Sequence, residues 1–298
     1  MATIIGGIGT SHTPTIGIAF DQGKQQHPAW SPLFKGYDPV VEWLARMQPD
    51  VLVMFYNDHA NTFFFDHYPT FAVSLSAQHT VADEGLGLRP VPPVNGHPGL
   101  ARHLAESLVT DEFDISVFTD LPIDHGCFSP LSVMWPEHKT GWPGAILPIE
   151  MNVLQHPMPT PRRCFKLGQA VRKAIESYPE DLNVVVVGTG GLSHQLAGER
   201  AGFNNSEWDL RFLDLLANEP ETLANMTHGD FIELGGSEGA EVIMWLAMRG
   251  ALSNNIKKLH QNYYLAMTAA WGVQLFEEPA ARDRMHSRNT SATSRAGA

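Results

Sequence analysis

The chain has 298 residues, of which 43% are hydrophobic and 17% charged, with 20 Lys and Arg against 32 Asp and Glu. This length and apolar content exclude a disordered protein and a small scaffold that depends on disulfides. The formal net charge of −12 argues against nucleic acid or an anionic membrane surface as a partner, because both need a basic surface. The chain has 14 histidines but only two cysteines, Cys127 and Cys164. We therefore expect any bound metal to lie among nitrogen and oxygen ligands.

The N-terminal segment does not resemble an export signal. It has no basic region, and Gly6 and Gly7 interrupt its apolar run. No stretch approaches the roughly 20 consecutive apolar residues of a membrane-spanning helix. These features favour a cytoplasmic protein.

Short runs of β-branched and aliphatic residues predict buried strands. In chain order they are Ala2–Ile5, Val51–Tyr56, Phe71–Leu75, Ile115–Phe118, Ala145–Ile149 and Val184–Val187. Apolar residues at helical spacing predict helices over Pro39–Met47, Leu100–Leu108, Cys164–Ser177, Trp208–Ala217, Glu238–Arg249 and Asn255–His260. Strands that alternate with helices are typical of an α/β domain, in which helices cover a parallel or mixed sheet.

The chain shows no internal repeat and no Ser/Gly linker that would divide it, so we expect a single domain over residues 1–280. Long loops rich in Pro and Gly are expected at 21–38, 78–99 and 150–162, and long ordered loops are often functional. Residues 281–298 combine four Arg with small polar residues and lack apolar periodicity. This composition predicts a disordered C-terminal tail.

Four histidines follow predicted strands, each after a short turn: His12, His59, His125 and His194. In open α/β sheets, ligands bind beyond the carboxyl ends of the strands. We expect these four imidazoles to meet at one edge of the sheet. For any single histidine the simpler interpretation is a loop hydrogen bond, and the other ten histidines lie in polar loops or on helix surfaces.

One acidic residue is a natural companion to these histidines. Glu241 shares a helical face with Met244, Trp245 and Met248, whereas Glu238 lies in the first turn, where it suits the helix dipole. A carboxylate on an apolar face needs a partner, because burying it unpaired is costly. A metal ion would be such a partner, and a salt bridge or hydrogen bond is the alternative.

Two imidazoles and one carboxylate form a facial triad with open metal positions. This set suits non-haem Fe(II) in oxygen chemistry and also hydrolytic zinc. The spacing does not separate the two metals. The zinc protease pattern H-E-x-x-H is absent from the sequence.

Six motifs together resemble one enzyme family, the class III extradiol ring-cleavage dioxygenases, in the catalytic (β) subunit branch of protocatechuate 4,5-dioxygenase and gallate dioxygenase. The motifs are Ser11-His12-Thr13-Pro14, Tyr56-Asn57-Asp58-His59, Ala82-Asp83-Glu84-Gly85, Asp124-His125-Gly126, Gly188-Thr189-Gly190-Gly191-Leu192-Ser193-His194-Gln195 and Gly236-Ser237-Glu238-Gly239-Ala240-Glu241. The likeness covers nearly the whole chain before the predicted tail.

The resemblance implies a three-layer α/β/α domain with a central mixed sheet and an Fe(II) cofactor. It implies that His12, His59 and Glu241 are the iron ligands and that His194 is the acid/base residue. It also implies that His125 is a second catalytic histidine facing the substrate. The resemblance places Asn57 beside the iron as a substrate-binding residue, and Thr268 near the substrate carboxylate.

The activity implied by the resemblance is extradiol cleavage of a carboxylated catechol such as protocatechuate or gallate. Both atoms of O2 are inserted, as in bacterial catabolism of lignin-derived aromatics. Relatives carry a small helical α subunit or an equivalent fused domain, and this chain contains neither, so we expect a separate α subunit or an enzyme that works without one, in an oligomer. The alternatives are a zinc hydrolase that uses the same triad and a non-catalytic binding protein of the same fold.

Overall fold

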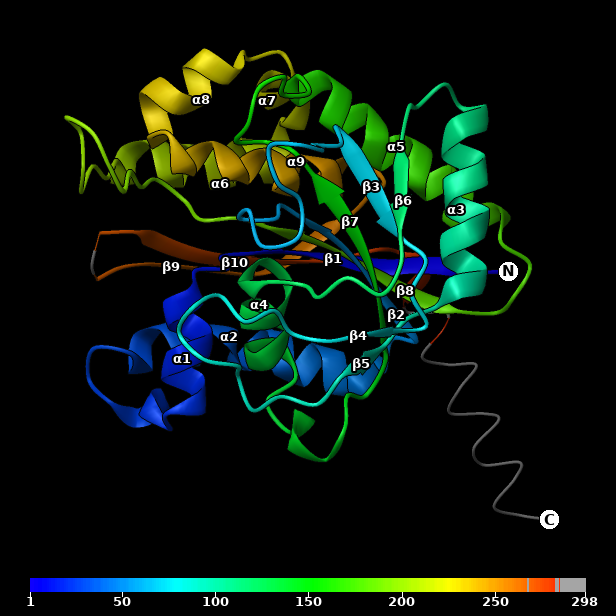
Figure 1. The fold of residues 1–298 in the computed structure, drawn as a ribbon, viewed down its shortest axis with the longest axis horizontal. Helices are drawn as coiled ribbons and strands as arrows, with labels where there is room; N and C mark the ends of the chain where they lie inside the picture. The colour runs from blue at the N-terminus through cyan, green and yellow to red at the C-terminus, as the bar shows by residue number, and fades with distance from the viewer. Residues whose placement is uncertain (267, 282–283, 285–298) are drawn as a thin grey trace.

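The computed structural model describes residues 1–266, 268–281 and 284, so almost all of the predicted tail lies outside the described residues (Figure 1). An eight-stranded mixed sheet in the order β6-β3-β7-β2-β8-β1-β10-β9 forms the centre. Its strands are β1 (Thr3–Thr10), β2 (Val51–Tyr56), β3 (Phe71–Ser74), β6 (Ser116–Phe118), β7 (Ala145–Met151), β8 (Asn183–Thr189), β9 (Lys257–Leu265) and β10 (Ala270–Glu277). A separate two-stranded sheet pairs β4 (Gln78–His79) with β5 (Val94–Asn95).

Helices cover both faces of the large sheet, which is therefore the middle of three layers (Figure 1). One face carries α1 (Pro14–Asp21), α2 (Ser31–Met47) and α4 (His125–Met134). The other carries α3 (Pro98–Thr110), α5 (Pro161–Ser177), α6 (Ser206–Asn218), α7 (Pro220–Ala224), α8 (His228–Gly235) and α9 (Ile243–Gly250). The predicted three-layer α/β/α fold in a single domain is confirmed.

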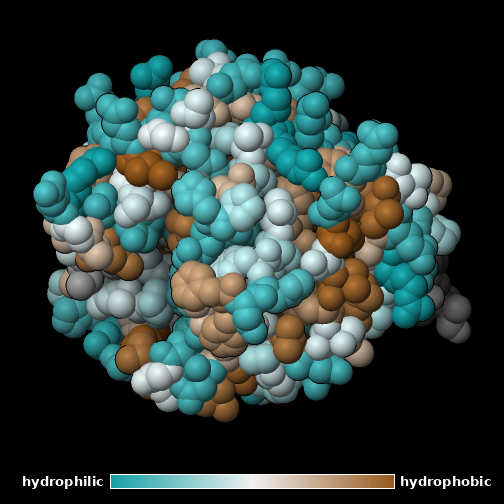
Figure 2. All heavy atoms as spheres, turned by 45° about the horizontal axis from the view of Figure 1, so that its top comes forward, coloured by the Kyte–Doolittle hydropathy of each residue, from teal (hydrophilic) through white to brown (hydrophobic). Residues whose placement is uncertain are grey.

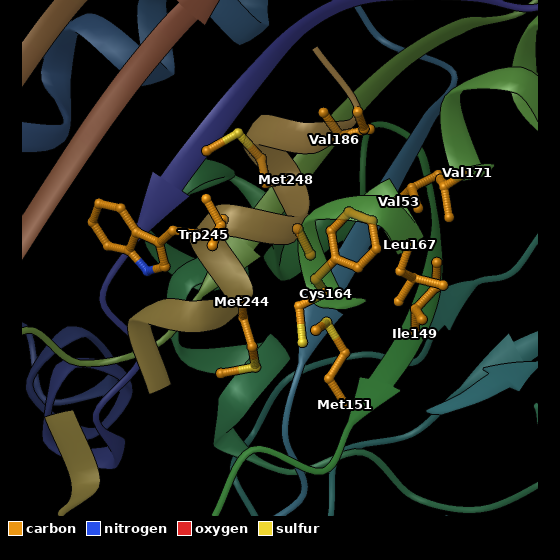
Figure 3. Packing of buried hydrophobic residues seen from close by; sticks show 14 of the residues in the cluster. Val53, Ile149, Met151, Cys164, Leu167, Val171, Val186, Met244, Trp245 and Met248 are labelled. Carbon is orange, nitrogen blue, oxygen red and sulfur yellow. The ribbon is translucent and has the colours of Figure 1, made fainter. Parts of the chain in front are cut away.

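The sequence of β2 shows why the sheet is covered on both sides. Val51, Val53 and Phe55 pack into the core beneath α5 and α9, whereas Leu52, Met54 and Tyr56 point to the opposite core. All six side chains are buried, so the strand reads as a continuous apolar run rather than an alternating one. Figure 3 shows residues of the first core, among them Trp245 and Met248 of α9, Leu167 of α5 and Val53 of β2.

The helix predicted at Asn255–His260 is wrong, because most of that segment belongs to strand β9. This strand lies at the edge of the sheet and pairs antiparallel with β10. Lys257 and Lys258 are exposed there, and lysine on an edge strand opposes pairing with another chain. The helix predicted at Glu238–Arg249 begins as a 3₁₀ helix, η3 (Glu238–Val242), before α9. The structure also contains α1, α4 and β10, which the sequence patterns did not predict.

The strand directions determine which loops meet. Strands β7, β2, β8 and β1 are adjacent and parallel, so their carboxyl ends lie at one edge of the sheet. β10 runs antiparallel to β1 and therefore begins at that edge. The residues after β1, β2 and β8 and those before β10 thus come together by topology alone.

The surface in Figure 2 shows apolar patches broken up by polar side chains. The most exposed large apolar residues include Phe65 and Leu86, which lie in loops. Within the described residues, no helix is both long and apolar enough to cross a membrane.

The two-sided core predicts a large cost for Leu167→Ala. Leu167 is fully buried on α5, so its removal leaves a cavity and should lower the free energy of unfolding by about 2–5 kcal/mol. The matched control is Leu210→Ala on α6, which is 49% exposed and should change stability by no more than about 0.5 kcal/mol. Chemical denaturation measures both. Equal effects of the two substitutions would contradict this packing.

Candidate metal centre

His12 follows β1 directly and is buried to 1% exposure. Its Nδ1 lies 3.0 Å from the Oγ1 of Thr189, the last residue of β8. That hydroxyl donates its own proton to the Phe55 carbonyl, so it accepts the Nδ1–H of His12. The inner nitrogen, Nε2, is left as a lone pair that points at Glu241, 2.9 Å from Oε2.

His59 follows β2 and is held in the same way. Its Nδ1 and its backbone N–H both donate to Oδ2 of Asp124, at 2.8 Å in each case. Its Nε2 faces Oε1 of Glu241 at 3.1 Å. Asp124 also caps α4 by accepting from the Gly126 N–H, so one carboxylate fixes a helix start and an imidazole.

Glu241 lies in η3 and is 2% exposed. Besides the two imidazoles, its carboxylate accepts from the backbone N–H of Gly191 at 3.1 Å and from Asn57 Nδ2 at 3.3 Å. A Cβ on Gly190 would lie 2.6 Å from the carbonyl oxygen of Glu241, so a glycine at this turn lets η3 come close. The carboxylate is thereby aimed into the gap between His12 and His59.

Burial and neighbouring charges shift the pKa values of these three groups in opposite directions. Burial lowers the pKa of His12 below its ordinary value, even with Glu241 beside it. Burial alone also lowers the pKa of His59, but Asp124 and Glu241 outweigh it and raise this pKa well above the usual range. Burial raises the pKa of Glu241, yet His12 and His59 together hold it well below its usual range. Glu241 is thus an anion that needs a positive charge beside it.

The donor set fits a divalent transition metal. With both Nδ1 atoms committed as donors, both Nε2 atoms are turned toward the Glu241 carboxylate, and Asn57 Nδ2 also lies 3.3 Å from Nε2 of His59. A proton on each ring, or one shared cation, would satisfy this arrangement. Two ligand atoms about 2.1 Å from one ion and at right angles to each other are about 3.0 Å apart. The N–O separations of 2.9 and 3.1 Å agree with that spacing. The group is a candidate metal site with the open positions of a facial triad.

His125 lies at the start of α4, and its ring centroid is 4.0 Å from that of His59. His12, His59 and His125 each offer a ring nitrogen, and these atoms lie within 4.8 Å of one another. The Nδ1 of His125 donates to Oε1 of Glu84 at 2.7 Å, and Glu84 also accepts the backbone N–H at 3.1 Å. The strand-end argument fails for this histidine, because β6 runs opposite to β7 and ends at the far edge. The segment between β6 and α4 returns the chain to the edge of the sheet where the other histidines lie.

His194 follows β8 and is 5% exposed. Its Nδ1 donates to the Leu192 carbonyl at 2.7 Å, so Nε2 is the ring nitrogen that remains for a ligand. A Cβ on Gly191 would lie only 2.5 Å from Cε1 of His194. The glycine run therefore lets the imidazole fold back over the turn, and it does not cradle a phosphate.

A cavity of about 260 Å³ connects these groups. Its walls include His12, His59, Glu241, His125 and His194, together with Pro14, Leu154, Leu196, Glu238, Thr268 and Trp271. Thr268 is exposed at this cavity, whereas Asn57 lies behind Glu241 and lines a different cavity. Roles for Asn57 and Thr268 in substrate binding stay predictions. The sequence patterns assigned no function to four residues of this site, although the first three of them stand in the quoted motifs: Asp124, Thr189, Glu84 and Trp271.

The fold is a three-layer α/β domain. Two histidines and a glutamate meet at the carboxyl edge of its sheet and form a candidate metal site. Residues 6–275 match the model of a family described as the catalytic LigB subunit of aromatic ring-opening dioxygenase. The chain belongs to this family, and the resemblance predicted from the motifs is confirmed.

Individual relatives agree with this assignment. A gallate dioxygenase of Pseudomonas putida KT2440 is 56% identical over 197 residues, which are 66% of this chain and 58% of that protein. The match thus spans less than two thirds of that relative. A 2,3-dihydroxyphenylpropionate/2,3-dihydroxicinnamic acid 1,2-dioxygenase of Cupriavidus necator is 30% identical over 282 residues, covering 75% of this chain and 87% of that protein.

A solved structure of an uncharacterised protein from Escherichia coli K12 shares the fold. It has a TM-score of 0.52 and 16% identity, and the match covers 91% of this chain and 99% of that one. At this identity the likeness supports the fold alone.

The geometry distinguishes two acidic residues that stand three positions apart. Glu241→Ala should lose metal, with affinity falling more than about 100-fold, because loss of an outer partner alone costs about 10–100-fold. Glu238→Ala should retain metal, because Glu238 bonds only to Ser237 Oγ and to the Leu196 N–H. Metal content per chain after anaerobic Fe(II) loading and desalting measures this, with circular dichroism as the folding control. The reverse pattern would show that Glu241 is not a ligand.

Proposed function

We propose that this chain is the catalytic part of an Fe(II)-dependent extradiol dioxygenase that opens the ring of a carboxylated catechol, such as protocatechuate or gallate. The observation that carries the proposal is the pair of Nε2 atoms 2.9 and 3.1 Å from the Glu241 carboxylate, beside a cavity lined by two further histidines. His12, His59 and Glu241 would hold the iron. When bound, Fe(II) would supply an electrophilic centre that holds the catecholate and O2 together and passes electrons between them.

His194 acts as the proton acceptor. Its Nδ1–H is fixed on the Leu192 carbonyl, so the other ring nitrogen is the one free to take a proton from a catechol hydroxyl. Its position in the cavity wall beside the cluster supports this role. The same nitrogen can return the proton later in the reaction.

His125 acts as a hydrogen-bond donor to anionic oxygen. Glu84 accepts its Nδ1–H and fixes the orientation of the ring, and Nε2 donates when it carries a proton. A donor that is already oriented costs no reorganisation when negative charge develops in the reaction.

The substrate carboxylate is recognised by neutral donors. Within the described part of the chain, no Lys or Arg lines the cavity. The indole Nε1 of Trp271 is buried at the cavity and lacks a hydrogen-bond partner among the described residues, and Thr268 adds a hydroxyl. Pro14, Leu154 and Leu196 supply apolar surface for a flat aromatic ring.

We further propose that a small helical subunit, or an equivalent domain, covers this cavity. Leu196 is 67% exposed where it lines the cavity, and Thr268 is exposed there too. The gallate dioxygenase of Pseudomonas putida contains sequence beyond the matched 58%. Exclusion of water would strengthen the electrostatic contacts inside the site.

Oxygen uptake tests the function. Protein loaded anaerobically with Fe(II) should consume O2 when given protocatechuate or gallate, assayed in parallel with and without a candidate covering subunit. Zn²⁺-loaded protein should consume none. Absence of uptake with every catechol under every condition would refute the proposal, and hydrolytic activity with Zn²⁺ alone would favour the zinc alternative.

His194→Ala separates proton transfer from metal binding. The variant should keep its iron and lose activity by about 100-fold or more, because general acid–base catalysis contributes about 10²–10⁴-fold. Turnover number and metal content measured on one preparation give the answer. Loss of iron from this variant would contradict the role assigned to His194.

Glu84→Gln tests the orientation of His125. The side chain keeps its shape but loses the charged acceptor that holds the Nδ1–H of His125, so kcat should fall by about 10–100-fold while metal content stays unchanged. The matched control is Asp83→Asn, whose exposed carboxylate accepts only the nearby Gly85 N–H. The control should leave kcat unchanged. An unchanged kcat in Glu84→Gln would contradict a positioning role.

A further inference from the structure

A second cavity, of about 200 Å³, adjoins the catalytic cavity at His59. Both cavities share His59 and Leu154, but the second has a different lining. Its polar wall contains Asn57, Asp58 and Glu150, and its outer part is formed by Ala60, Tyr68 and Gln155. None of these side chains except His59 belongs to the proposed metal cluster.

The polar wall of this cavity is made of oxygen atoms that lack partners. Both carboxylate oxygens of Glu150, Oδ1 of Asp58 and Oδ1 of Asn57 are buried and have no hydrogen bond to any described residue. Glu150 is fully buried, and Asn57 and Asp58 are 2% and 5% exposed. Buried polar atoms in native proteins are nearly always satisfied, so this concentration of acceptors calls for a ligand.

The neighbours of Asn57 and Asp58 determine which oxygen of each side chain is left free. The amide nitrogen of Asn57 donates to Oε1 of Glu241, so its oxygen must face the other way. The other oxygen of Asp58 accepts three backbone N–H groups, from Asn61, Thr62 and Phe63, which leaves Oδ1 as the free one. Glu150 is held on β7 by the pairing of that strand with β2.

The local charge balance leaves room for a second cation. Five carboxylates gather here: Asp58, Glu84, Asp124, Glu150 and Glu241. The described linings of the two cavities contain no Lys or Arg. One divalent metal at the catalytic cluster would offset two of the five negative charges that these carboxylates carry when ionised. Burial, then Asp58 and Asp124, raise the pKa of Glu150 well above its usual range, which is the mark of a carboxylate without a counter-charge.

We propose that the Asn57, Asp58 and Glu150 side chains form a second cation site, for a hard divalent ion of the Ca²⁺ type, directly behind the catalytic cluster. Oxygen-only ligands select such ions over the transition metals that prefer imidazole. A bidentate Glu150, one oxygen of Asp58 and the amide oxygen of Asn57 give four protein ligands, and the cavity has space for the waters that complete six to eight.

The site would act on the catalytic cluster through Asn57. The amide joins the two sites, because its nitrogen contacts Glu241, its oxygen is unpartnered and the residue lines the second cavity. A cation on Asp58 would also fix residues 58–63, the loop that begins beside His59. Asn57 is therefore a positioning residue that couples occupancy of one site to the geometry of the other.

The test uses Tb³⁺, a luminescent substitute for Ca²⁺, on the full chain with its catalytic cluster filled by Zn²⁺. Tyr68 lines the cavity and should sensitise emission from a bound ion. We expect one Tb³⁺ per chain, displaced by Ca²⁺ but not by additional Zn²⁺. Glu150→Gln should weaken binding at least about tenfold, because the site loses a charged bidentate ligand.

Two further variants keep the result interpretable. Asp58→Asn should weaken binding similarly, since an amide nitrogen would face the cavity, and it serves if Glu150→Gln does not fold. The matched control is Glu180→Gln, an exposed glutamate that accepts a hydrogen bond from Tyr178 at 2.7 Å and should leave emission unchanged.

Three outcomes would overturn the second site. They are no Ca²⁺-displaceable emission from the folded chain, emission that excess Zn²⁺ displaces, or equal binding by wild type and both cavity variants. A crystal structure grown with Ca²⁺ that shows only water in the cavity would do the same. Because none of these measurements needs turnover, failure here is separate from failure of the dioxygenase proposal.

Discussion

The site depends on one constraint: a buried carboxylate is aimed between two imidazoles whose outer nitrogens are already in use. Thr189 and Asp124 hold the Nδ1 atoms of His12 and His59, so both inner nitrogens turn toward Glu241. Without those anchors either ring could rotate and satisfy the carboxylate as an ordinary hydrogen-bond donor. Thr189 is the last residue of β8, and Asp124 caps the start of α4. The positions of these two elements therefore determine which nitrogen of each imidazole faces Glu241.

The centre of the fold was predictable because its strands are buried on both faces. Continuous runs such as Val51–Tyr56 have few interpretations, and each predicted run overlaps a strand of the sheet. The antiparallel edge was not predictable in this way. β10 contains Gly272, Gln274 and Glu277, which interrupt its apolar run, and Gln274 is tolerated inside only because it donates to the Leu213 carbonyl and to Gln261. β9 is half-exposed at the edge, where polar residues obscure its strand character.

The candidate site was predictable in part, because a rule about strand ends applies to some of its residues and not to others. His12, His59 and His194 follow parallel strands, so a rule about strand ends places them correctly. His125 also reaches the site, but by a route that the rule does not describe, because β6 runs the other way. The anchors Thr189, Asp124 and Glu84 are defined by contacts between residues distant in the chain, such as the 177 positions between His12 and Thr189. No local pattern carries that information.

The three proposed ligands come from the beginning, the first quarter and the last quarter of the chain. An ion held by residues 12, 59 and 241 would act as a cross-link that closes two long loops. Because the unfolded chain has no such preformed cage, binding to the native state alone would add about 4 kcal/mol to its stability at a metal concentration 1,000 times the dissociation constant. Metal supply would then govern how long the folded chain persists as well as whether it can react.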